Sequence, residues 1–274
     1  MTGATDSAMP SAPMRRWQRF TPLQRLGRFC AYLATVAAVA WSIRTIEVIP
    51  EFLYDAPEQT LDLVKRMWPF DWAYYPKAIH GALPETFHIA TLGTLLALVI
   101  AVPVAILGAR NVTRNPWLNA CARFVFVASR SVNSLIWALL FVAVFGPGAL
   151  AGTLAIACRS IGFVGKLLSE ALEESPAGPI EALTAIGAPR SHVLLEGYWP
   201  QVQPGFWSIA LLRWDINLRE SSVLGLVGAG GIGMALDAAL SNLYWDQAGL
   251  ILAIILVVVL LVETVTTLVR KRIL

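Results

Sequence analysis

The sequence has few charged residues. Of its 274 residues, 14% are charged and 57% are hydrophobic, whereas a soluble domain carries roughly 25% charged residues. The shortage excludes an ordinary soluble domain and is typical of a membrane protein.

Cysteine and histidine are also scarce, and this argues against several kinds of active site. The three cysteines show no C-x-x-C spacing, so a metal site is not expected. The three histidines do not cluster, and no Ser/His/Asp arrangement can be argued. We therefore predict no catalytic and no metal-binding residue. The cysteines are Cys30, Cys121 and Cys158, and the histidines are His80, His88 and His192.

Long stretches with almost no charge recur along the chain. A bilayer-spanning helix needs about 17 to 25 mostly apolar residues, and six stretches approach this length. They are residues 29–43, 88–109, 124–145, 148–164, 206–227 and 248–262. The sequence thus predicts an all-α membrane protein with about six transmembrane helices.

The positions of Lys and Arg predict how these helices are oriented. Arginines precede the first span, basic residues follow spans two, four and six, and residues 228–247 contain neither Lys nor Arg. Under the positive-inside rule, both termini lie in the cytoplasm. No basic patch with interleaved aromatics suggests nucleic acid as a partner.

The chain divides into four predicted parts. They are a cytoplasmic tail (1–28), a first transmembrane helix (29–49), a periplasmic interfacial segment with an aromatic belt (50–83) and a core (84–274). The first helix also resembles a signal peptide, but the apolar character continues to Ile49 and we expect the helix to be retained. Within the core, residues 167–199 are broken by Ser-Pro and Gly-Ala-Pro, which predicts short helices outside the bilayer.

Residues 223–233, VLGLVGAGGIG, raise a different possibility. Gly228 to Gly233 match the G-x-G-x-x-G pattern of dinucleotide sites. Such a site requires a βαβ unit, whereas the flanking segments are predicted spans. We therefore expect a turn at the outer end of span five.

Span five is unusually polar, with the sequence LLRWDINLRESS from Leu211 to Ser222. Charged side chains are costly at membrane depth, so they should be partnered or face a water-filled cavity. On a helix, Arg213 and Asn217 share one face with Ser221, and Asp215 shares another with Arg219. Two interpretations remain open: a polar lining of a translocation pathway, or a structural ion pair with a snorkelling arginine.

Several of these motifs resemble the permease subunits of ABC importers, and more closely the phosphonate-importer permeases. Those proteins carry a cytoplasmic loop with the pattern E-A-A, three residues, G, and a later I-x-L-P. Here Glu181, Ala182, Leu183, Gly187 and Pro200 occupy that pattern, with Leu183 in place of the second Ala, and Gly and Trp in place of Ile and Leu. RWDINLRESSVLGLVGAGGIG (213–233) and SIGFVGKLLSEALEE (160–174) are also similar to the subfamily.

The subfamily also reads R-[SA]-x-P-E-L where this chain has Arg130 and Ser131 followed by Asn133 and Ser134. The lost carboxylate changes the charge near the expected path. This departure is compatible with a smaller oxyanion such as phosphite or hypophosphite.

The resemblance implies a type I, MetI-like importer core in the bacterial inner membrane. It implies that the loop around Glu181 couples the permease to an ATPase, as a short helix that begins near Glu181 and reverses at Gly187. It also implies a translocation pathway and gate. We expect these at Arg130, Asn133, Arg213, Asn217, Arg219, Ser221, Ser222, Gly228, Gly230 and Gly231.

The implied function is ATP-driven import of a phosphonate, phosphite or hypophosphite by alternating access. The implied partners are ABC ATPase subunits that bind ATP and Mg, a second permease copy, a periplasmic binding protein and membrane lipid. This chain itself would need no cofactor. The alternative is an integral membrane enzyme with its site among the polar residues of spans three and five.

Overall fold

The computed structural model describes residues 20–46 and 50–273 and divides the chain into two units between Thr60 and Leu61. The first unit contains α1 (Pro22–Thr45) and most of α2 (Pro50–Arg66). Residues 1–19 of the predicted tail lie outside the described residues. The side chains described on α1 are all exposed, as expected for an apolar helix that lies in lipid.

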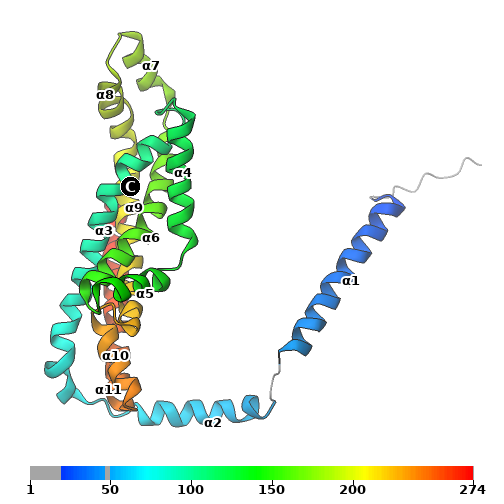
Figure 1. The fold of residues 1–274 in the computed structure, drawn as a ribbon, viewed down its shortest axis with the longest axis vertical. Helices are drawn as coiled ribbons and strands as arrows, with labels where there is room; N and C mark the ends of the chain where they lie inside the picture. The colour runs from blue at the N-terminus through cyan, green and yellow to red at the C-terminus, as the bar shows by residue number, and fades with distance from the viewer. Residues whose placement is uncertain (1–19, 47–49, 274) are drawn as a thin grey trace, which may run out of the picture. The chain divides into compact units, whose positions relative to one another are not determined.

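The described residues of the second unit form helices joined by turns and short loops (Figure 1). Its elements are η1 (Trp72–Tyr74), η2 (Tyr75–Ile79), α3 (His80–Gly108), α4 (Pro116–Ser131), α5 (Ser134–Phe145), α6 (Ala149–Glu173), α7 (Ala177–Ala185), α8 (Arg190–His192), η3 (Val193–Tyr198), α9 (Trp199–Leu224), η4 (Gly225–Val227), α10 (Ile232–Ser241) and α11 (Trp245–Ile273).

Six candidate spans result when two bent pairs each count as one. Four helical segments are long and apolar enough to cross a membrane: residues 23–45, 72–108, 149–173 and 245–272. The bent pairs are α4 with α5, at 89°, and residues 190–227 with α10, at 41°. The prediction of an all-α protein with about six spans is confirmed.

The third predicted span, residues 124–145, is not one continuous helix. It starts earlier, at Pro116, and breaks between α4 and α5 because Val132 is extended. The Asn133 side chain accepts a hydrogen bond from the backbone N–H of Leu135, at 3.1 Å, and so caps a new helix. The sequence carries a signal for this break, which the prediction of a single span did not use: polar residues at 129–134 interrupt the apolar stretch, and Asn is a preferred N-cap residue.

Helix α6 lies at the centre of the second unit and packs on α3, α4, α5 and α9. Small residues make these approaches close. A Cβ at Gly162 would lie 2.6 Å from the Phe126 carbonyl oxygen of α4, and one at Gly93 of α3 would lie 2.7 Å from Ile156. Glycines at such crossings let two helix backbones approach one another in a membrane.

The aromatic segment before α3 is only partly the exposed belt that the sequence predicted. Trp68 and Trp72 are exposed. Phe70, Tyr74 and Tyr75 instead pack against a buried cluster formed by η2, α10 and α11. The segment therefore helps to hold this end of the unit together.

Candidate functional site

The loop predicted to contact an ATPase folds as α7, α8 and η3, at the end of the second unit opposite α10 (Figure 1). This agrees with the prediction of short helices with turns between them. Helix α6 continues to Glu173, so the first residues of the predicted loop 167–199 are helical extensions of a span. Only a short connection separates α6 from α7, so a movement of α7 would be transmitted directly to α6.

Glu181 lies in the middle of α7, and the expectation that it begins the helix is wrong. The helix starts at Ala177, after Pro176, and has Pro179 in its first turn, where a missing N–H leaves no hydrogen bond unmade. The helix dipole therefore gives no reason for a carboxylate at this position.

Gly187 ends α7 as the sequence predicted. Its φ is +78°, a conformation that glycine adopts without strain. The backbone N–H of Ala188 donates to the Leu183 carbonyl and that of Gly187 donates to the Thr184 carbonyl, both at 3.1 Å. These two bonds are the Schellman pattern of a helix that reverses sharply.

The two faces of α7 differ. Ile180 and Leu183 pack against the cluster that contains Val193 and Tyr198. Glu181, Ala182 and Ala185 are exposed, and 79% of the surface of Ile186 is uncovered. Pro200 sits in the first turn of α9, which begins at Trp199.

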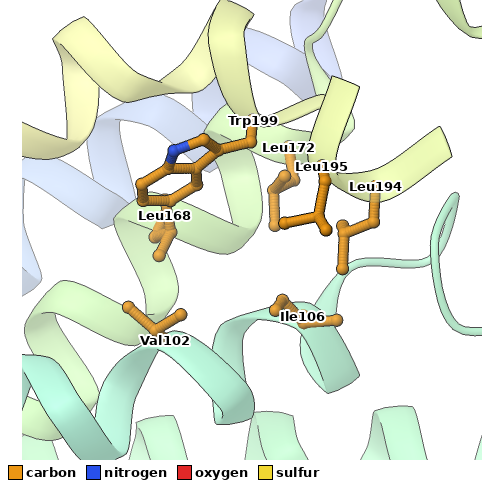
Figure 2. Close-up of a pocket in the computed structure, with 7 residues that line it drawn as sticks. All are labelled: Val102, Ile106, Leu168, Leu172, Leu194, Leu195 and Trp199. Carbon is orange, nitrogen blue, oxygen red and sulfur yellow. The ribbon is translucent and has the colours of Figure 1, made fainter. Parts of the chain in front are cut away.

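A pocket with a volume of about 240 Å³ lies where the loop joins the spans. Figure 2 shows its lining, which is apolar apart from the indole nitrogen of Trp199. The residues come from α3, α6, η3 and α9: Val102, Ile106, Leu168, Leu172, Leu194, Leu195 and Trp199. Such a lining provides no charged group and almost no hydrogen-bond donor for an oxyanion. We interpret the pocket as part of the packing that joins the loop to the spans.

A buried polar cluster joins α3, α6 and α9 within the spans. Arg213 donates from Nε to Ser160 Oγ at 2.8 Å, and Ser160 also contacts Asn217 Oδ1 at 3.2 Å. Asn217 Nδ2 donates to Thr94 Oγ1 at 2.7 Å. These bonds satisfy polar groups that would be costly to leave unpaired inside a membrane.

Glu220 extends this cluster toward the surface. Its two carboxylate oxygens face two arginines, Arg213 at 3.5 Å and Arg159 at 3.7 Å. The Arg213 side chain is 3% exposed, whereas those of Arg159 and Glu220 are 32% and 18% exposed. The cluster is thus open on the side of Arg159.

Asp215 and Arg219 form their ion pair on a different face of α9, as the helical spacing predicted. They line a cavity of about 120 Å³ with Glu263, Thr266 and Arg270 of α11. Arg219 therefore lies on another face of α9 than the cluster around Arg213.

The remaining expected pathway residues are dispersed. Asn217 and Ser221 are fully buried, and in this conformation they tie α9 to α3. Ser222 is buried against Leu218 of its own helix. Arg130 is exposed at the end of α4, and Asn133 Oδ1 lies 3.5 Å from Arg159.

The glycine-rich stretch forms a turn between η4 and α10, and the residues described contain no strand for a dinucleotide site. Gly228, Gly230 and Gly231 all have positive φ. The Gly228 carbonyl accepts from the Gly148 N–H at 2.9 Å, and Thr86 Oγ1 accepts from the Ile232 N–H at 2.8 Å. The turn therefore links α3, α6 and α10.

Sequence reasoning assigned no site role to Arg159, Ser160, Thr94 or Glu220. A signal for Arg159 was present, because a lone arginine in an apolar run marks a functional position by default. Ser160 and Thr94 carried no such signal, since hydroxyls are common in membrane helices.

The fold and this site define a helical membrane permease with an exposed loop at one end and a polar cluster inside. Residues 93–273 match the family described as "Binding-protein-dependent transport system inner membrane component". The chain belongs to this family. It is therefore a multi-pass inner-membrane component of an ABC transport system rather than an enzyme.

Two similar proteins carry names that bear on substrate. The chain is 40% identical to the "Phosphate-import permease protein PhnE" of Mycolicibacterium smegmatis over 87% of its own length and 44% of that protein. It is 36% identical to the "Phosphite transport system permease protein PtxC" of Stutzerimonas stutzeri, over 91% of this chain and 90% of that one. The chain thus spans less than half of the first relative and nearly all of the second.

Solved structures share the fold. An amino acid ABC transporter matches with a TM-score of 0.62 at 19% identity, over 73% of this chain and 96% of that chain. The MetNI methionine ABC transporter in an inward-facing conformation matches with a TM-score of 0.61 at 21% identity, over 72% and 96%. The expected MetI-like core is confirmed.

Proposed function

We propose that this chain is the permease subunit of an ABC importer that carries a phosphorus oxyanion, namely a phosphonate, phosphite or hypophosphite, into the cytoplasm by alternating access. The names of the two similar permeases support this class of substrate. A membrane-embedded cluster with two arginines and one carboxylate also favours an anion.

The observation that carries the proposal is the exposed tip of the second unit. Ile186 and Ala182 lie uncovered beside the reversal at Gly187, while Ile180 and Leu183 anchor the same short helix to the spans. An exposed isoleucine on a rigid projection is suited to a protein partner. We propose that Glu181, Ala182, Leu183, Gly187 and Pro200 form the coupling loop for an ATPase that binds ATP and Mg.

The proposed assembly contains two ATPase subunits, two permease copies, identical or homologous, and a periplasmic binding protein. We propose the topology predicted above, with a cytoplasmic tail (1–28), a first helix (29–49), a periplasmic segment (50–83) and a core (84–274) that holds the coupling loop 167–199. The distribution of Lys and Arg supports cytoplasmic termini.

Within the core, we propose that the pathway runs past the open side of the polar cluster. Asn133 lies at that side, and Arg213, Asn217, Ser221 and Ser222 support its wall from within the bundle. We place Arg130 and Arg219 at the approaches to the path, and the turn at Gly228, Gly230 and Gly231 at the outer gate.

Uptake by the assembled system tests this function. The chain is coexpressed with its ATPase and binding protein, purified as a complex and reconstituted into proteoliposomes. We expect ATP-dependent accumulation of radiolabelled phosphite or a phosphonate, and stoichiometric copurification of the ATPase. A chain that purifies alone, or a complex that accumulates none of the three oxyanions, would contradict the proposal.

A further inference from the structure

We propose that Arg159 is the side chain that binds the transported oxyanion inside the membrane, and that Glu220 holds this arginine when no anion is bound. The inference rests on the proposed function, because it names the residue that receives the substrate of that function. It differs from the sequence-based expectation, which named Arg130, Arg213 and Arg219.

Depth and exposure mark Arg159 as a pathway residue. It lies ten residues after the first residue of α6, Ala149, or about 15 Å along the helix at 1.5 Å per residue. A helix that enters a hydrocarbon core about 30 Å thick at its first residue would bring Arg159 near the middle of that core. A third of its side-chain surface is nevertheless open, and a charged group at such depth faces water or a partner rather than lipid.

The contacts that hold Arg159 are long. Its Nη1 lies 3.5 Å from Asn133 Oδ1 and 3.4 Å from Ser134 Oγ, and its Nε lies 3.7 Å from Glu220. Well-formed hydrogen bonds from nitrogen to oxygen measure 2.7–3.2 Å. A guanidinium has five N–H donors, so this arginine keeps most of its hydrogen-bonding capacity for another acceptor.

Arg213 shows the opposite arrangement and is held as a structural residue. Its side chain is 3% exposed, its Nε donates to Ser160 at 2.8 Å, and its guanidinium lies 5.3 Å from the ring of Phe163. Both arginines face the same carboxylate, but only Arg159 is open and loosely held.

The charge of the cluster favours an anion. Arg159 and Arg213 share one carboxylate, Glu220, which leaves one positive charge without a counter-ion in the cluster. A phosphorus oxyanion presents two oxygens that match the planar donor pairs of arginine. The amino terminus of α5 meets the same point, because Asn133 and Ser134 begin that helix, and its dipole adds positive potential.

The exchange of partners requires only the long contacts of Arg159 with Asn133, Ser134 and Glu220 to break. The oxyanion takes the donors of Arg159, and Glu220 keeps its contact with Arg213. When the anion leaves, Glu220 again accepts Arg159. An internal carboxylate of this kind prevents tight trapping, which transport requires because the substrate must also depart.

The experiment uses the reconstituted complex with saturating loaded binding protein. Arg159→Gln removes the charge, Arg159→Lys keeps the charge without the planar fork, and Arg66→Gln is the control. Arg66 is exposed and pairs with Asp62 at 2.7 Å on α2, so the control removes one arginine charge elsewhere. The readouts are phosphite uptake, ATP hydrolysis and the binding of radiolabelled phosphite to complexes purified without binding protein.

We expect uptake and phosphite binding to fall about tenfold or more in Arg159→Gln, consistent with the loss of a charge-assisted hydrogen bond. We expect a smaller loss in Arg159→Lys, unchanged values in Arg66→Gln, and ATP hydrolysis retained in all three.

Wild-type phosphite uptake by Arg159→Gln would overturn the role of Arg159 while leaving the importer function intact. An equal loss in Arg66→Gln would overturn it as well. Failure of the wild-type complex to accumulate any oxyanion would instead contradict the proposed function. If Arg159→Gln does not assemble, Arg159→Lys decides, because unchanged phosphite binding by that variant would count against the inference.

Discussion

At the scale of single residues, helix α9 shows how one polar segment serves two purposes. Arg213, Asn217 and Glu220 join the interior cluster, whereas Asp215 and Arg219 pair on the side of α11. Helical spacing predicted the two faces correctly. It could not supply the partners Ser160 and Thr94, which lie on other helices.

Asn217 gives a test of the interior cluster. Asn217→Leu keeps a similar volume but removes the bond to Thr94 and the acceptor for Ser160. We expect a loss of about 1–3 kcal/mol of stability, because polar groups stay buried without partners. Thermal unfolding of the detergent-purified complex measures it.

The control for this substitution is Asn242→Leu. Asn242 is exposed after α10, and among the residues described its side chain bonds to the Ala238 carbonyl of its own helix and to no other group. We expect little change there. Equal stability losses in the two variants would show that the buried network contributes nothing particular.

At the scale of elements, the close crossing of α4 and α6 depends on glycine. Gly162→Ala places a Cβ 2.6 Å from the Phe126 carbonyl oxygen and 2.7 Å from Ser129 Oγ. Because neither helix backbone yields easily, we expect a loss of about 1–3 kcal/mol. Thermal unfolding checks this, with Gly205→Ala of α9 as control, since nothing lies within 4 Å of its added Cβ. A stable Gly162→Ala would disprove the constraint.

The reversal at the end of α7 provides a second element-scale test. Gly187→Glu forces a side chain onto a residue with φ of +78° and adds charge beside the exposed Ile186. We expect ATP hydrolysis to continue while uptake falls about tenfold, because the proposed contact with the ATPase is displaced. Parallel assays of ATP hydrolysis and uptake in proteoliposomes measure the coupling.

Gly178→Glu separates charge from backbone geometry in that test. Gly178 lies in the first turn of the same helix, without positive φ and with open space around it. We expect coupling to survive there. Unchanged uptake by Gly187→Glu would argue against the docking role of the loop.

At the scale of the whole molecule, the proposed topology places the two ends of the second unit on opposite sides of the membrane. Cys30, Cys121 and Cys158 are first replaced by alanine to remove background labelling. A cysteine at exposed Leu243 should then react with a membrane-impermeant maleimide from outside, and one at Ile186 only after permeabilisation. The reverse pattern would refute the orientation.

The sequence by itself determined the membrane class, about six spans, the family resemblance and the reversal at Gly187. Hydropathy, sequence motifs and the ability of glycine to adopt a positive φ are all local properties of the chain. The break at Asn133 was not predicted, although polar residues at 129–134 interrupt the apolar stretch there and the Asn133 side chain caps the new helix. Only the tertiary structure decided that Arg159 shares Glu220 with Arg213. Arg159 lies on α6, whereas Arg213 and Glu220 lie on α9, so the packing of α6 on α9 brings the Arg159 side chain within reach of that carboxylate.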